Sequence, residues 1–147
     1  ETVNFVNAVS LIKERGIKLR ESKSSQEGEF VNLIQLEIKT DKETKKVLGT
    51  LSSNKQPRIV KIDDYYLELY PVGEMVFIRN WDKPGLIGSL GTLMGKHNIN
   101  IAAMTFGRDK PGGKAISILN VDSQVEADIQ EKIKKLENIL TVKVIRT

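Results

Sequence analysis

Residues 80–104 read NWDKPGLIGSLGTLMGKHNINIAAM, and this stretch decides the fold of the second half of the chain. A strand ends near Asn80, an Asp-x-Pro-Gly turn follows at 82–85, and apolar residues then recur at the spacing of one helix face. A second strand opens near Asn100. The stretch therefore predicts a strand, a tight turn, a helix over 86–96 and another strand.

Strands and helices continue to alternate on both sides of this stretch. The continuous apolar run within 74–80 predicts a strand that is covered on both faces. The β-α-β-β-α-β order is typical of a ferredoxin-like fold, an antiparallel four-stranded sheet with two helices on one face. The other expected elements are a strand at 99–106, a hairpin loop at 108–114, a strand at 115–121, an amphipathic helix through 125–136 and a strand at 139–145.

The first half predicts a second, mostly antiparallel α+β unit. Pro71-Val72-Gly73 indicates a boundary, so we expect two small α+β domains, at 1–72 and 73–147. The elements expected in the first domain are a helix at 4–15, a polar turn at 21–29 and strands at 30–40, 47–51, 58–62 and 65–70.

Composition excludes several classes of protein. The 147 residues include 39% apolar and 29% charged residues, which is ordinary for a globular protein, and no apolar run is long enough to cross a membrane. The chain has no cysteine, so it has no disulfide or thiolate chemistry, which fits a cytoplasmic location. The net charge of +4 is spread along the chain, so we expect no nucleic-acid partner. Because residue 1 is Glu, we expect a fragment or a processed chain.

No group of residues has the pattern of an active site. His97 ends a predicted helix, and Asp63-Asp64 is a turn former. Gly88, Gly91 and Gly95 lie within or at the end of a helix, where we expect them to let it approach the sheet closely rather than to bind a nucleotide. With no nucleophile–base pair and no metal-ligand cluster, these residues predict no catalytic site and no metal.

The turn at 82–85 predicts a ligand site instead. The Asp82 carboxylate suits an ammonium group, and the free N–H groups at a helix start suit a carboxylate. Asn80 and Asn100 flank the helix, and both carboxamides are expected at the same rim, where they can bind a hydroxyl. Together these groups describe a polar amino acid. The alternative is purely structural: Asp82 caps the helix and Gly85 relaxes the turn.

Two stretches of the chain resemble known families. Residues 74–146 resemble an ACT domain, a small amino-acid-binding regulatory module, most specifically in DKPGLIG, GTLMGKHNINIAAM and PGGKAISILNVD. Residues 1 to about 72 resemble the intervening domain that precedes the ACT domain in long-form D-3-phosphoglycerate dehydrogenases, in VNFVNA, KERGIK, ESKSS, GTL and PRIVKI.

The resemblance implies the regulatory part of such a dehydrogenase, without its catalytic domains. The parent enzyme would oxidise 3-phosphoglycerate with NAD in serine biosynthesis, and the residues here would hold no cofactor. L-serine, or a similar small amino acid, would bind between ACT domains whose sheets join into one of eight strands, in a homodimer or tetramer. The implied contacts are Asn80, Asp82, the backbone at Leu86 and Ile87, and Asn100 from the partner chain.

The resemblance also implies a candidate anion site in the first domain. Arg58, in PRIVKI, matches a basic position that holds an anionic ligand in relatives, whereas Tyr70 and Asn120 stand where further arginines are expected. The alternative for Arg58 is a solvated charge at a strand edge.

Two other functions stay open at this point. One is a structural association module that binds no ligand, because exposed sheet edges drive assembly in either case. The other is the regulatory region of an iron-sulfur L-serine dehydratase, which uses related domains. KERGIK, ESKSS and PRIVKI favour the dehydrogenase.

Overall fold

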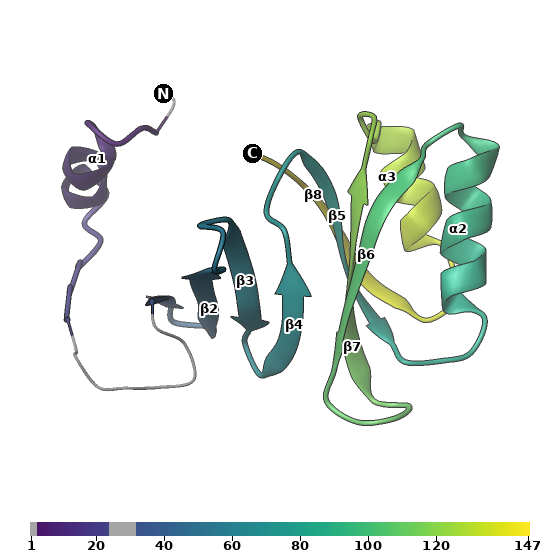
Figure 1. Cartoon of the computed structure of the whole chain (residues 1–147), viewed down its shortest axis with the longest axis horizontal. Helices are drawn as coiled ribbons and strands as arrows, with labels where there is room; N and C mark the ends of the chain where they lie inside the picture. Colours follow the sequence, from purple (N-terminus) through teal and green to yellow (C-terminus); the bar gives the residue numbers. More distant parts are fainter. Residues whose placement is uncertain (1–2, 24–31) are drawn as a thin grey trace. The chain divides into compact units, whose positions relative to one another are not determined.

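The computed structural model describes residues 3–23 and 32–147, which divide into two compact units at Val31/Asn32 (Figure 1). The predicted boundary between residues 72 and 73 falls between two sheets of the second unit, and as a domain boundary it stays a prediction. The polar turn expected at 21–29 and the first residues of the strand expected at 30–40 lie mostly outside the described residues. No helix in the described parts of the chain has the length and apolar character needed to span a membrane.

The first unit contains one short helix, α1 (Ala8–Glu14). The Asn4 side chain accepts hydrogen bonds from the N–H groups of Val6 and Asn7 at 2.9 and 3.0 Å, which organises the turn that leads into the helix. Gly16 ends the helix with φ +65°, a conformation that glycine adopts at little cost. The helix predicted at 4–15 is therefore confirmed and is shorter than expected.

The second unit begins with an antiparallel sheet of four strands in the order β1-β2-β3-β4. Each strand pairs with the next in the sequence, so the sheet is a simple meander. The strands are β1 (Leu33–Lys39), β2 (Thr44–Leu51), β3 (Pro57–Ile62) and β4 (Tyr65–Leu69). The predicted strand at 47–51 begins three residues earlier than expected, because the register of the hairpin brings Thr44 opposite Lys39.

The rest of the second unit has the predicted β-α-β-β-α-β order, with strand order β6-β7-β5-β8 and every pair antiparallel (Figure 1). The ferredoxin-like prediction is confirmed, and the helix expected at 86–96 has those bounds. The elements are β5 (Glu74–Trp81), α2 (Leu86–Lys96), β6 (Ile101–Arg108), β7 (Lys114–Val121), α3 (Ala127–Lys134) and β8 (Ile139–Arg146).

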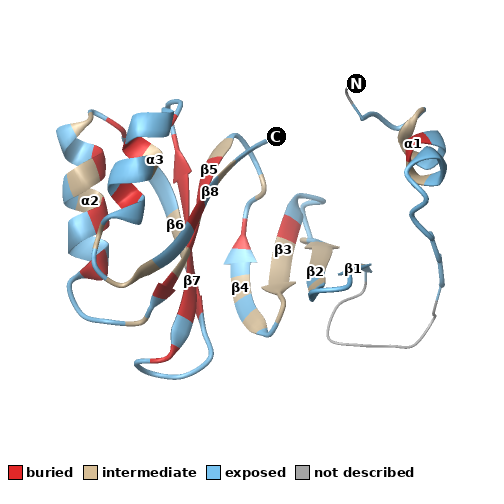
Figure 2. Cartoon of the chain, turned by 180° about the vertical axis from the view of Figure 1, so that it is seen from behind, coloured by how far each residue is buried: buried red, intermediate tan, exposed pale blue. Residues whose placement is uncertain are grey.

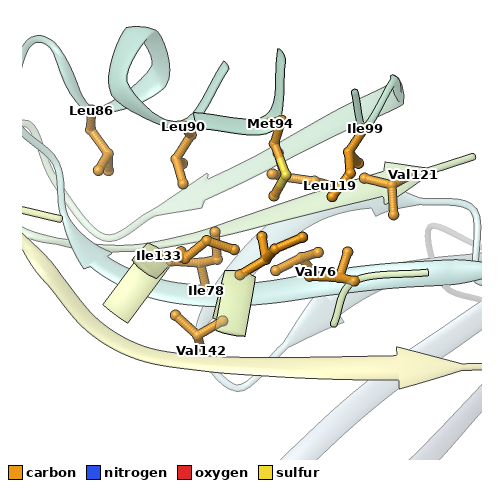
Figure 3. Packing of buried hydrophobic residues seen from close by; sticks show 12 residues of the cluster. Val76, Ile78, Leu86, Leu90, Met94, Ile99, Leu119, Val121, Ile133 and Val142 are labelled. Carbon is orange, nitrogen blue, oxygen red and sulfur yellow. The ribbon is translucent and has the colours of Figure 1, made fainter. Parts of the chain in front are cut away.

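One core lies between this second sheet and its two helices. Leu86, Leu90 and Met94 are spaced at i, i+4 and i+8, so they point from one face of α2 to the sheet (Figure 3). They meet Val76 and Ile78 of β5. The even-numbered residues of β5 therefore face the helices, which is what a period of two requires.

A second core lies on the opposite face of the same sheet. Met75 of β5 and Ile116 and Ile118 of β7 are buried against Leu69 of β4 and its neighbours. Every residue of β7 from Ala115 to Val121 is consequently buried (Figure 2). The prediction that the apolar run at 74–80 is covered on both faces is confirmed, and the covering residues on the far side come from β3 and β4.

An ion-pair cluster joins the two sheets at the β3–β4 turn. Asp63 accepts hydrogen bonds from Arg79 Nη2 at 2.6 Å, from Lys45 Nζ at 3.3 Å and from the Lys46 N–H at 3.1 Å. Burial raises the pKa of the Asp63 carboxyl, but the Lys46 N–H, Lys45 and Arg79 together outweigh it and lower that pKa below its usual value. Asp63 is a turn former, as predicted, and it also links β5 to the first sheet.

The prediction for the glycines of α2 is wrong. A Cβ added at Gly88, Gly91 or Gly95 would meet no atom within 4 Å among the described residues. These glycines lie on the side of the helix away from the sheet, because Leu86, Leu90 and Met94 occupy the face that packs. The close approach of α2 to the sheet therefore does not depend on them.

Candidate functional site

A pocket of about 270 Å³ lies where β5 ends and α2 begins. It is framed by the last residues of β6 and by β7, and a wider hollow of about 480 Å³ adjoins it around the 82–85 turn. The lining of the smaller pocket includes Asn80, Asp82, Leu86, Ile87, Phe106 and Arg108. Four of the five predicted effector-binding residues are thus brought together.

Asn80 forms the buried inner wall of this pocket. Asn80 is 2% exposed. Its Oδ1 accepts a hydrogen bond from Ser117 Oγ at 2.8 Å, and its Nδ2 donates one to Trp81 O at 3.0 Å. A register shift against β8 between Arg79 and Asn80 sets this position. A carboxamide has two acceptor lone pairs and two N–H donors, so Asn80 keeps one of each for a ligand.

Asp82 is held by the β6–β7 hairpin across the pocket. Its Oδ2 accepts hydrogen bonds from Arg108 Nη1 at 3.0 Å and from the Gly112 N–H at 3.2 Å, and its own N–H donates to Gly113 O at 2.8 Å. The Arg108 guanidinium and the Gly112 N–H hold the pKa of the Asp82 carboxyl below its usual range.

Asp82 does not cap α2, so the structural alternative is wrong for this residue. The N-cap position is Gly85, with φ +90°, and no side chain among the described residues makes a capping hydrogen bond. Leu86 turns its side chain into the core at 6% exposure, whereas Ile87 is 54% exposed at the pocket. In every α-helix the N–H groups of the first turn lack an acceptor within the helix. In α2 these groups are not occupied by a capping side chain from the described residues.

Asn100 lies away from this pocket, which corrects the expectation that both carboxamides share one rim. α2 returns the chain along β5, so β6 begins at the far end of the sheet from Asn80. There the Asn100 Nδ2 donates to Asp122 Oδ2 at 2.5 Å. Within one chain, Asn100 does not complete the site.

Arg58 is buried rather than solvated, so the strand-edge alternative is also wrong. It is 6% exposed, its guanidinium lies 3.2 Å from the centre of the Tyr70 ring, and Nη1 donates to Pro57 O at 3.0 Å. Nη2 donates to Gln56 Oε1 at 3.2 Å, and Nε lies 3.5 Å from Glu68 Oε1.

The two residues that replace the expected arginines take part in the same arrangement. Tyr70 supplies the ring under the guanidinium, and Asn120 Nδ2 donates to the backbone oxygens of Tyr70 and Val72 at 3.0 and 3.1 Å. Arg58 therefore has a structural role here, and the anion site stays a prediction.

Arg108 and Ser117 are two of the pocket residues that sequence reasoning missed, along with Lys83, Phe106, Gly107 and Ala115. Arg108 was expected in the hairpin loop at 108–114, but it is the last residue of β6 and lies on the same face as Phe106. Alternation along the strand would have placed both side chains on the face that the helices cover. Within residues 3–23 and 32–147, no group of three His, Asp or Glu residues is arranged to hold a metal ion.

The fold and the pocket define a class of protein, the regulatory modules built on the ACT domain, and residues 75–138 match the model of that domain. Residues 1–63 match the model of the D-3-phosphoglycerate dehydrogenase intervening domain. The chain belongs to the D-3-phosphoglycerate dehydrogenase family and corresponds to the C-terminal regulatory region of its members.

Curated relatives agree over nearly the whole chain. It is 38% identical over 144 residues to D-3-phosphoglycerate dehydrogenase of Bacillus subtilis, covering 98% of this chain and 27% of that protein. The identity to the enzyme of the same name from Methanocaldococcus jannaschii is 38% over 143 residues, covering 97% of this chain and 27% of that protein. The chain thus spans about a quarter of these relatives. Between the two families left open above, the matches favour the dehydrogenase.

Proposed function

We propose that this region binds L-serine, or a similar small amino acid, as an allosteric effector in the pocket between the end of β5 and the start of α2. The observation that carries the proposal is that one pocket of about 270 Å³ combines the Asp82 carboxylate, the buried Asn80 amide and an uncapped helix start. An α-amino acid needs an anion for its ammonium group and N–H donors for its carboxylate, and such a pocket offers both.

The size and the spare hydrogen-bonding capacity of the pocket support a small hydroxylated ligand. Asn80 keeps one donor and one acceptor free, which matches the two roles of a hydroxyl group. Leu86 and Phe106 supply apolar contacts beside it. A larger apolar amino acid would leave the spare donor and the spare acceptor of the buried amide unpaired, which costs affinity.

We further propose that the complete site forms between two copies of the ACT domain. β6 is an edge strand of its sheet, with Asn100 just before its start and Arg108 at its end. If two β6 strands pair antiparallel about a twofold axis, the start of one lies near the end of the other. Asn100 of a second copy would then come close to the pocket, and the two sheets would join into one of eight strands.

In the full-length protein, this pairing would connect ligand binding to assembly. A ligand held by two copies stabilises the paired arrangement, and differential affinity for two arrangements is what allosteric coupling requires. The proposal includes NAD-dependent oxidation of 3-phosphoglycerate by catalytic domains outside these 147 residues, in a cytoplasmic homodimer or tetramer.

Calorimetric titration of the 147-residue chain with L-serine tests the proposal, beside an Asp82→Ala variant. We expect saturable binding by the wild type and at least about tenfold weaker binding by the variant, because a charge-assisted hydrogen bond is worth about 1.5–3 kcal/mol. Asp64→Ala is the matched control, since Asp64 is exposed in the β3–β4 turn and does not line the pocket. A folded wild type that gives no heat at millimolar L-serine would leave a structural association module as the function.

A further inference from the structure

Arg108 is the side chain that bridges the pocket. Phe106, Gly107 and Arg108 all line it, and a Cβ at Gly107 would meet Tyr65 Cβ at 3.0 Å on the opposite face of the sheet, so the side chains that reach the pocket are those of Phe106 and Arg108. From the end of β6, Arg108 Nη1 reaches Asp82 Oδ2 at 3.0 Å. The ion pair therefore spans the space between the β5–α2 turn and β6.

The balance of charge in the lining is positive. Asp82 contributes one anion, and Lys83 and Arg108 contribute two cations. Arg108 and the Gly112 N–H both bind Asp82 Oδ2, so an amine can approach Oδ1, but it adds a further positive charge to the lining and brings no anion for the guanidinium. A ligand that also carries a carboxylate supplies that anion itself.

We propose that Arg108 is a specificity-determining residue that receives the carboxylate of an amino acid, so that the pocket selects amino acids over amines with the same side chain. This inference rests on the proposed function and assigns a role to a residue outside the five predicted contacts. One carboxylate oxygen would be bound by Arg108 and the other by N–H groups at the start of α2. The guanidinium has five donors in a planar fork, which suits a carboxylate.

The geometry allows the exchange of partners. The side chains of Arg108 and Asp82 are 58% and 32% exposed, so water replaces their mutual contact as the pair opens. Asp82 keeps the Gly112 N–H bond on its carboxylate and the Gly113 bond on its own backbone N–H when Arg108 turns away. Binding thus replaces one ion pair with two, ligand ammonium to Asp82 and ligand carboxylate to Arg108.

Three small ligands separate the contributions of the two charged groups. L-serine carries both groups, ethanolamine lacks the carboxylate and 3-hydroxypropanoate lacks the ammonium group. Calorimetry with the 147-residue chain would give the Kd of each for the wild type and for Arg108→Gln and Arg108→Lys. Lys110→Gln is the matched control, because it removes one positive charge from the adjacent hairpin without touching the pocket lining.

We expect Arg108→Gln to weaken the binding of L-serine and of 3-hydroxypropanoate by about tenfold or more, which is the usual effect of losing a charge-assisted hydrogen bond. Ethanolamine should bind Arg108→Gln at least as well as the wild type, so the preference for L-serine over ethanolamine should fall by a similar factor. The preference of Arg108→Lys for L-serine over ethanolamine should lie between those of the wild type and Arg108→Gln, since lysine keeps the positive charge but lacks the planar fork of donors. Lys110→Gln should keep the wild-type preference.

Two results would overturn the inference while the proposed function stands. One is an unchanged preference in an Arg108→Gln variant whose circular dichroism and melting match the wild type. The other is tighter L-serine binding by that variant, which would make Arg108 a competitor for Asp82. A wild type that binds none of the three ligands would overturn the proposed function and this inference together.

Discussion

At the scale of single residues, the pocket depends on a buried pair of polar side chains. Asn80 and Ser117 lie on neighbouring strands at 2% and 1% exposure, and the hydroxyl donates to the amide at 2.8 Å. A buried polar group without a partner costs free energy, so each of these residues needs the other. The inner wall of the pocket is therefore buried and hydrogen-bonded before any ligand arrives.

We expect Asn80→Ala to lower the free energy of unfolding by about 1–3 kcal/mol, because it leaves the Ser117 hydroxyl buried without its acceptor. Ser117→Ala should also destabilise the chain. The double variant should lose less than the sum of the two single losses, since the hydroxyl stranded by the first change is removed by the second. Urea denaturation of the four proteins checks this, and strictly additive losses would contradict the coupling.

Sequence reasoning at this scale identified single residues better than their partners. Asp82 and Asn80 were recognised from the turn and the strand end, because both signals are local. The partners of Asp82 are 26 and 30 residues away, at Arg108 and Gly112, and they depend on the strand register, which the local pattern does not contain. For the same reason, the burial of Arg58 against Tyr70 could not be foreseen.

At the scale of elements, α2 has two faces with different constraints. Its apolar face packs on the sheet and contains no glycine, whereas a methyl group added at Gly91, within the helix, would meet no atom of the described residues within 4 Å. Gly85, just before the helix, has φ +90° and needs the freedom of a glycine. The same substitution, glycine to alanine, should therefore have opposite effects on stability at the two positions.

We expect Gly91→Ala to raise the free energy of unfolding by about 0.5–1 kcal/mol, because alanine loses less backbone entropy in a helix. Gly85→Ala should lower it by about 1–2 kcal/mol, because an L side chain is strained at that φ. Thermal unfolding of both variants measures the two changes. A clear loss of stability in Gly91→Ala would show that another surface packs on this face of α2.

Periodicity was enough to predict the elements themselves, but their arrangement needed the fold. The apolar spacing in 86–96 predicted both ends of α2, because the 82–85 turn precedes it and His97 follows it. Asn100 was predicted at the same rim as Asn80. It lies at the opposite end of the sheet, because α2 runs back along the sheet before β6 begins. The glycines of α2 were predicted to face the sheet but lie on the opposite side of the helix, because a pattern of small residues does not indicate which face packs.

At the scale of the whole second unit, two sheets are joined by an apolar core and by one cluster of charges. Asp63 and Arg79 form the shortest contact of that cluster, and the Asp63 side chain is only 17% exposed. The contact is between a turn of the first sheet and the strand that leads to the pocket. Its strength therefore depends on the ionisation of a single carboxyl group.

We expect Asp63→Asn to lower the free energy of unfolding at pH 7 by about 1–3 kcal/mol. Asparagine tolerates the φ of +52° at this position, so the backbone is kept. Because the folded-state pKa of Asp63 is lowered, its stabilisation is fully present above the unfolded pKa of about 4 and is lost as the pH falls through the folded value.

Urea denaturation of the wild type, Asp63→Asn and Asp64→Asn at pH 7, 5 and 3 measures this dependence. The difference between wild type and Asp63→Asn should be constant from pH 7 to 5 and smaller at pH 3. Asp64→Asn should stay close to the wild type, since Asp64 is exposed. A difference that grows as the pH falls would contradict the assigned role of the carboxylate.

The double burial of β7 has a consequence for how this region can change over generations. Successive residues of the strand belong to alternate cores, with Ile116 and Ile118 in one and Leu119 and Val121 in the other. The strand therefore has no outward surface on which substitutions could accumulate without effect. Substitutions that leave both cores intact are therefore expected outside the strand, at exposed hairpin positions such as Lys110 and Pro111.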